Sequence, residues 1–169
     1  MKSFFGMACF FVLGMLHAQP PEFALTPNGF DAVTVDIPAT SNEKLISLTK
    51  NWAQDYNRTQ EGSDISNVTQ NSITITAYKK NAFNYGNRGE NFYHKIKYDI
   101  RFEFNQSSYT VSFNITEIYL DDVLLEYKLP DYFTSEGKLK DGYNTLDVTL
   151  EDTVNDIVNS HYDFIMNYR

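Results

Sequence analysis

The clearest pattern in the chain is a strict alternation of apolar and polar side chains over residues 92–104. The even positions are apolar or aromatic apart from one histidine, and the odd positions carry charges or a tyrosine hydroxyl. Because successive side chains of a strand point to opposite faces, this period of two predicts a long strand with one buried face. The residues expected on the buried face are Phe92, His94, Ile96, Tyr98, Ile100, Phe102 and Phe104.

Shorter alternating segments predict further strands on both sides of this one. They lie over residues 30–37, 64–68, 72–78, 109–120 and 123–129. In the fourth of these segments, residues 109–120, the apolar side chains move from odd to even positions after Glu117, to Ile118 and Leu120. An extra residue that shifts the parity of a strand is typical of a β-bulge, so we expect one at this point.

Apolar residues at steps of three and four predict two amphipathic helices, over residues 42–56 and about 145–167. Acidic residues lie in the first turns of the second helix, where the helix dipole favours negative charge. Each helix has one face to bury, and each strand has one apolar face. The order of elements therefore predicts a two-layer α+β domain over residues 30–169, with a curved antiparallel sheet and both helices on one face.

The first residues of the chain differ from all the others. Lys2 is followed by an uncharged apolar run over residues 4–16, and the small residue Ala18 precedes a proline pair. A positive start, an apolar stretch of about 7–15 residues and a small residue at the cleavage point are typical of a signal peptide. The run is shorter than the roughly 20 residues of a membrane-spanning helix. We therefore expect a signal peptide at residues 1–18, an extended lead-in at 19–29, and a periplasmic or extracellular protein that is not membrane-embedded after cleavage.

Loss of this segment changes the chemistry of the chain. Cys9 is the sole cysteine, so the mature protein has no disulfide, zinc–thiolate site or cysteine nucleophile. The whole chain has 14 Lys and Arg against 22 Asp and Glu, and loss of Lys2 lowers the formal net charge from −8 to −9. Such a surface repels phosphate groups over a Debye length of about 10 Å. We therefore expect neither nucleic acid nor anionic lipid as a partner.

Candidate catalytic groups are few. The two remaining histidines, His94 and His161, both lie on inward-facing stripes and could approach each other where the last helix crosses the long strand. A metal site that Glu117 completes would still need a supporting second shell, and no HExxH spacing is present. Two hydrogen-bonded core histidines are the simpler interpretation. Because no nucleophile elbow or phosphate loop occurs either, we expect no catalytic, metal-binding or cofactor-binding residues, and no cofactor.

Residues 79–91 lose the alternation and are rich in Asn and Gly, which predicts a loop. Exposed aromatic residues on loops are common contact residues, so this segment is a candidate contact loop for a protein or a glycan. The alternative is an ordinary connection whose aromatic side chains fold onto the sheet edge. The basic and aromatic residues of the candidate contact loop are Lys79, Lys80, Phe83, Tyr85 and Arg88.

The entry strand at residues 33–37, the helix face with Leu48 and Trp52, the strand at 92–104 and the closing acidic helix together resemble a known family. It is an uncharacterised domain of exported bacterial proteins, described as having a TATA-binding-protein-like fold. The resemblance covers residues 30–168 and rests on the order of elements. It implies the same strand–helix–sheet–helix arrangement and carries over no functional residue. DNA binding does not follow, because the expected open sheet face lacks the apolar wedges that enter a minor groove.

These observations favour a non-enzymatic exported domain that works through contacts with a protein or cell-surface partner. The alternative is a hydrolase or a metal-dependent enzyme with an unrecognised site. The two differ in an observable way, because an enzyme should have a pocket where several titratable groups with shifted pKa values converge.

Overall fold

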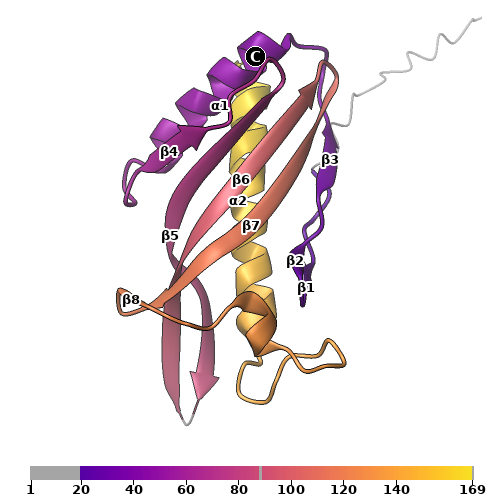
Figure 1. Cartoon of the computed structure of the whole chain (residues 1–169). Helices are drawn as coiled ribbons and strands as arrows, with labels where there is room; N and C mark the ends of the chain where they lie inside the picture. The colour runs from indigo at the N-terminus through magenta and orange to yellow at the C-terminus, as the bar shows by residue number, and fades with distance from the viewer. Residues whose placement is uncertain (1–19, 88, 169) are drawn as a thin grey trace, which may run out of the picture.

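The computed structural model describes residues 20–87 and 89–168 of the chain, and its elements form two layers (Figure 1). A curved antiparallel sheet makes one layer, and two helices on one face of the sheet make the other. This is the α+β architecture that the pattern predicted. The expected signal peptide and Arg88 lie outside the described residues.

The main sheet has six strands. Five of them follow the order β3-β7-β6-β5-β4, and the sixth, β8, pairs with β7. All of its neighbouring strands are antiparallel. The strands are β3 Val33–Asp36, β4 Ser63–Ser66, β5 Ser72–Asn87, β6 Glu90–Asn105, β7 Ser108–Leu120 and β8 Val123–Leu124. In β6 the even residues are buried along most of its length, as the alternation predicted.

The two helices have close to the predicted bounds. Helix α1 is Asn42–Tyr56, and the Ser41 hydroxyl caps it by accepting a hydrogen bond from the Lys44 amide. Helix α2 is Leu146–Tyr168 and runs along the back of the sheet (Figure 1). Trp52 of α1 contacts Phe102 of β6 edge to face, so the core lies between the helices and the sheet. Among the residues that the structure describes, no helix is both long and apolar enough to span a membrane.

The segment ahead of β3 is tied to α2. Residues 25–26 (β1 Leu25–Thr26) and 29–30 (β2 Gly29–Phe30) form a small hairpin, and Phe23 is buried in the core. The Phe23 amide donates to Asn155 Oδ1 at 2.7 Å, and Asn155 Nδ2 donates to the Phe23 carbonyl at 3.1 Å. The Leu25 amide donates to Glu151 Oε1 at 2.7 Å. These bonds hold the β1–β2 hairpin in place beside the sheet.

The bulge expected near the end of β7 is present. Lys97 pairs with Glu117 but Tyr98 pairs with Ile115, so Thr116 is the extra residue. The switch of parity after Glu117 was therefore a correct signal, with the bulge one residue earlier than expected. Local twist increases at a bulge, and β7 stays paired with β6 beyond this one, as far as Leu120.

The prediction of a loop over residues 79–91 is wrong. Strand β5 continues to Asn87 and β6 begins at Glu90, with an irregularity between Lys79 and Phe83 that Asn81 accommodates at a φ of 52°. Helix α2 supports this extension, because Thr153 Oγ1 donates to the Ala82 carbonyl at 2.7 Å. Tertiary contacts of this kind override the weak strand propensity of an Asn- and Gly-rich segment.

The last strand is also shorter than expected. Asp121 and Asp122 both have positive φ, which closes a tight two-residue hairpin, and β8 then pairs only at Val123–Leu124. The chain leaves the sheet after Leu125 and enters the 3-10 helix η1, Leu129–Tyr132, which contains Pro130. The paired part of this strand therefore ends at Leu124, short of the predicted end at Leu129.

Candidate functional site

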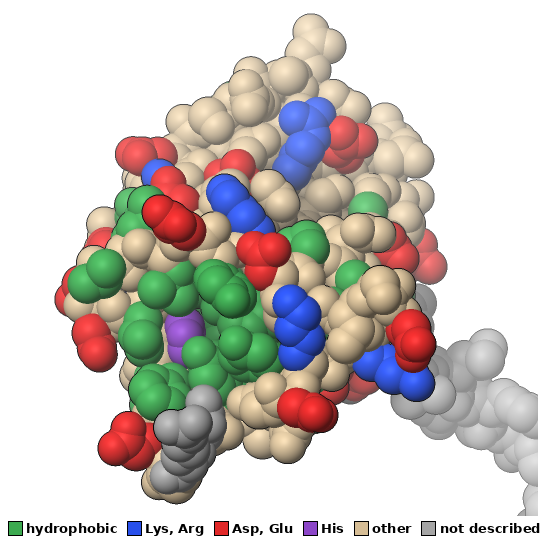
Figure 2. All heavy atoms as spheres, turned by 60° about the horizontal axis from the view of Figure 1, so that its bottom comes forward, with side chains coloured by type: hydrophobic (Ala, Val, Ile, Leu, Met, Phe, Trp, Pro, Cys, Tyr) green, Lys and Arg blue, Asp and Glu red, His purple; other side chains and the backbone are tan. Residues whose placement is uncertain are grey.

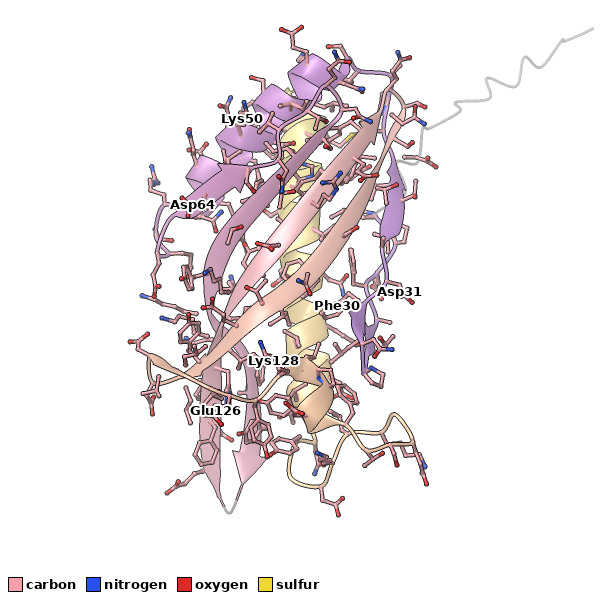
Figure 3. All side chains as sticks on the ribbon, in the orientation of Figure 1. Phe30, Asp31, Lys50, Asp64, Glu126 and Lys128 are labelled. Atoms are coloured by element: carbon pink, nitrogen blue, oxygen red, sulfur yellow. The ribbon has the colours of Figure 1, made fainter. Side chains whose placement is uncertain are left out.

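A groove of about 800 Å³ lies beside β7. Three segments line it: residues 28–30 at the β1–β2 hairpin, residues 113–118 of β7, and residues 124–130 between β8 and η1. Phe30 and the 124–130 segment with Glu126 and Lys128 are labelled in Figure 3. The volume falls within the roughly 300–1,000 Å³ of typical ligand sites. We call this feature the β7 groove.

The walls of the β7 groove are about equally apolar and polar and are held by defined contacts. Phe30 meets Phe113 edge to face with ring centroids 6.0 Å apart, which closes one end. At the other end the Leu125 amide donates to the Ile118 carbonyl at 2.8 Å. Because the β1–β2 hairpin is bonded to α2 as well, the groove is formed without any ligand.

The charged side chains at the β7 groove have different partners. Glu117 is held by Lys97 Nζ at 3.1 Å and by the Tyr119 hydroxyl. These two hydrogen bonds, of which the one from Tyr119 has the larger effect, lower the pKa of Glu117. Glu126 and Lys128 are exposed and make no ion pair within the described part of the chain. The groove therefore has one neutralised carboxylate and two exposed charges of opposite sign at its rim.

The open face of the sheet carries cations that acidic groups already hold. Lys95 Nζ lies 2.9 Å from Glu61 Oε1 and 2.6 Å from Asp122 Oδ1, and it also lies over the Tyr119 ring at 4.7 Å. Arg101 pairs with Glu103 at 2.8 Å. Side chains that neutralise one another in this way present a solvated polar face.

The structure places the residues of the candidate contact loop on strands. Phe83 is fully buried and stacks on His94 at 4.5 Å, whereas Tyr85 is half-buried and Lys80 is exposed. Lys79 Nζ donates to the Tyr56 hydroxyl at 3.3 Å. A contact role for this segment stays a prediction, but Phe83 cannot take part in it while the core is intact. Arg88 lies outside the described residues.

Aromatic side chains gather around this hairpin. Tyr85 contacts Phe92, His94, Tyr132 and Tyr143, with centroid distances of 4.7 to 6.4 Å. Figure 2 shows hydrophobic side chains collected on this end of the molecule, the lower end in Figure 1. The cluster joins β5, β6, η1 and the chain before α2, so it holds these elements together.

The two histidines do not meet. His161 stacks on Phe102 at 3.9 Å, and Phe102 lies eight residues beyond His94 on β6. At about 3.3 Å per residue, the strand separates the two histidines by roughly 26 Å. Within residues 20–87 and 89–168, no group of three or more metal-ligating side chains comes together. The hypothesis of a shared metal site with Glu117 therefore has no geometric support.

Their surroundings differ. His161 is fully buried, with Nε2 2.9 Å from Thr49 Oγ1 and Nδ1 3.4 Å from the Tyr109 hydroxyl. Burial lowers its pKa to about 3. His94 is equally buried, but neither ring nitrogen has a hydrogen-bond partner. Burial lowers the pKa of His94 too. The Phe92 backbone and the Asp121 charge raise this pKa, but by less than burial lowers it. The Phe92 backbone does not have the geometry of a hydrogen bond to the ring.

The sequence did not reveal the β7 groove. Its residues belong to three separate segments, of which residues 28–30 lie far from the other two in the chain, and none carries a motif. Leu124 and Tyr127 lie within a predicted strand, and only the structure shows that these large hydrophobic residues are exposed, at 56% and 50%. Their exposure depends on where the chain leaves the sheet. The pattern predicted that point later in the chain than the structure has it.

Comparison with known proteins adds evidence on the fold. No family model and no curated protein sequence matches the chain. A DUF4468 family protein from Bacteroides ovatus superposes with a TM-score of 0.58 at 11% identity, covering 83% of this chain and 85% of that one. A TBP-like protein from Parabacteroides distasonis superposes with a TM-score of 0.53 at 17% identity, covering 79% and 92%.

Identities this low show a shared fold, and neither description assigns an activity. The expected resemblance is confirmed at that level. The chain has the TATA-binding-protein-like α+β fold that its order of strands and helices predicted.

Proposed function

We propose that this protein is an exported, non-enzymatic binding domain that holds a polypeptide partner in the β7 groove. The apolar run at residues 4–16 supports export. The groove supports binding, because it combines a typical ligand-site volume with a lining of both apolar and polar side chains. That groove is the observation that carries the proposal.

The chemistry of the groove favours binding over catalysis. The carboxylate of Glu117 has a lowered pKa and is held by both Lys97 and Tyr119, so it is a poor proton donor or acceptor near neutral pH. Both histidines lie elsewhere, in the core. Detection of stoichiometric zinc in the purified mature protein would instead favour the metal-dependent enzyme.

Site-specific cross-linking in the native host tests the proposal. The photoreactive residue p-benzoylphenylalanine replaces Tyr127, which lines the groove, or Tyr93 of β6, which does not. The two tyrosines are matched, with exposures of 50% and 53%. We expect a discrete adduct with one polypeptide from position 127 and none from position 93. Equal labelling at both positions, or none at either, would contradict the proposal.

A second pair of variants checks the purified complex. Leu124 lines the groove and its neighbour Val123 does not, although both side chains are well exposed. L124R places a charge in the groove and should weaken binding of the identified partner at least tenfold, whereas V123R should leave it unchanged. Equal effects would place the contact outside the groove.

A further inference from the structure

Four tyrosines from separate parts of the chain meet next to the β7 groove. They are Tyr85 of β5, Tyr127 before η1, Tyr132 of η1 and Tyr143 before α2, and we call them the tyrosine cluster. Tyr143 meets Tyr85 and Tyr132 edge to face, with centroids 4.7 and 5.0 Å apart. Tyr127 contacts Tyr132 at 5.7 Å and an angle of 62°. Because neighbouring rings stand at steep angles, the cluster presents both ring faces and ring edges.

The hydroxyls of the tyrosine cluster are available as hydrogen-bond donors. None of them has a hydrogen-bond partner among the residues that the structure describes. Tyr127 is exposed, and Tyr85 and Tyr143 are half-buried. Burial, and then the neighbouring tyrosines, raise the pKa of both Tyr85 and Tyr132. These two phenols therefore keep their protons at neutral pH and can donate to a ligand.

The charges next to the tyrosine cluster are of both signs. Asp131 Oδ2 accepts from the Lys128 amide at 2.7 Å, and Lys140 Nζ donates to the Asp131 carbonyl at 2.6 Å. Glu126 adds a second exposed carboxylate on the same segment. Two acidic groups thus offset two basic groups, so charge selects neither a cationic nor an anionic ligand. A neutral ligand that is rich in hydrogen-bond acceptors fits this surface.

The tyrosine cluster is continuous with the β7 groove. Tyr127 belongs to the cluster and also lines the groove, as do Leu129 and Pro130 at the start of η1. We propose that the tyrosine cluster binds a proline-rich, extended segment of the partner polypeptide. This inference rests on the proposed function and specifies the chemistry of the partner.

A proline-rich segment complements the cluster in two ways. It adopts a polyproline II helix, which has no internal hydrogen bonds and leaves its carbonyl groups free to accept. Proline also lacks an amide donor, so such a segment offers acceptors to a surface that offers phenol donors. Aromatic side chains that form the walls of a binding surface are the usual partners of these segments, because the helix is preformed and loses little entropy on binding.

The segment belongs to another protein and not to a second copy of this chain. Only Pro20 and Pro21 are neighbours among its five prolines, and no two prolines lie three residues apart. Pro20 is buried in the fold, close to the buried Phe23 that Asn155 holds. This chain therefore has no free proline-rich segment to offer.

A library of linear dodecapeptides displayed on phage is the probe. It is selected on the mature protein, with Y127A as the counter-selection. We expect enriched peptides with prolines three residues apart, because a polyproline II helix has three residues per turn and these prolines share one face. Replacement of either proline by alanine should weaken binding of the synthetic peptide about fivefold or more, measured by fluorescence anisotropy.

Variants of the protein locate the contact. Y127A removes an exposed ring of the cluster, and Y93A removes an equally exposed ring of β6 outside it, with exposures of 50% and 53%. We expect Y127A to weaken peptide binding about tenfold and Y93A to leave it unchanged. Y143F keeps the ring and removes one donor, so binding should fall between about twofold and tenfold.

Several results would overturn the inference. Enriched peptides without spaced prolines, an affinity that does not depend on those prolines, or equal effects of Y127A and Y93A would each do so. Binding of an oligosaccharide on a glycan array that Y127A abolishes, with no peptide enriched, would assign the cluster to carbohydrate instead. If position 127 still cross-links to a polypeptide in any of these cases, the proposed function stands and only the proline-rich segment fails. If the spaced prolines are required but L124R leaves the natural partner unaffected, the groove proposal fails and recognition by the cluster stands.

Discussion

Replacement of His94 by phenylalanine should stabilise the protein. The imidazole is fully buried and stacks between β5 side chains, with a ring distance of 4.5 Å and an interplanar angle of 3° to Phe83. Neither of its nitrogens has a hydrogen-bond partner. Phenylalanine keeps the stacking and removes the two unsatisfied polar atoms.

The expected magnitude follows from opposing effects. A buried polar group without a partner costs about 1–3 kcal/mol. The larger phenyl ring introduces some overpacking, which costs about 1 kcal/mol, the low end of the usual range, when neighbouring side chains can adjust. We therefore expect H94F to raise the free energy of unfolding by up to about 2 kcal/mol. For a chain of this size that corresponds to a rise in melting temperature of roughly 2–4 °C per kcal/mol.

His161 provides the matched control. Its nitrogens lie within hydrogen-bonding distance of Thr49 and Tyr109, so H161F leaves both buried hydroxyls without that partner. We expect H161F to destabilise the fold by about 2–3 kcal/mol. Trp52, the sole tryptophan and almost fully buried, provides the fluorescence signal for urea unfolding at pH 7.5. Destabilisation by H94F of more than about 1 kcal/mol would refute the argument that an unpaired imidazole costs stability here.

Three further predictions concern the core and the N-terminus. Y98F should be neutral or stabilising by up to about 1 kcal/mol in the same urea assay, because the buried Tyr98 hydroxyl has no partner. Stability should fall on acidification below about pH 6.5, because unfolded His161 takes up a proton there while its folded pKa is about 3. The loss is about 1.4 kcal/mol per pH unit down to pH 3, so unfolding at pH 8 and pH 5 should differ by about 2 kcal/mol, and a flat profile would contradict it. Intact-mass analysis of the protein secreted by its host should find a chain that begins at Gln19, and retention of Lys2 would exclude cleavage.

The strands and helices with regular patterns were predictable from the sequence. The alternation in β6 identified both the strand and its buried face, because side-chain direction in a strand depends only on position along it. The bounds of α1 agree with the prediction for a similar reason, since a 3.6-residue repeat is a local property. The switch of parity near Glu117 revealed the bulge at Thr116 because a bulge shifts that same local pattern.

Tertiary contacts decided the regions where the local pattern is weak. The pattern predicted a loop over residues 79–87, yet pairing with β6 and hydrogen bonds with α2 keep them extended. The β7 groove was likewise decided by tertiary contacts. It depends on where the chain leaves β8 and on the β1–β2 hairpin that Asn155 holds beside β7.

The sequence by itself determined which face of each regular element is buried, and from this the two-layer architecture followed. It could not determine which polar groups in the core would find partners. His94 and His161 occupy equivalent inward positions in their patterns, but only His161 meets hydroxyl groups. Hydrogen bonds between distant segments depend on distances of about 3 Å that only the assembled fold sets, because periodicity specifies the direction of a side chain and not its neighbour.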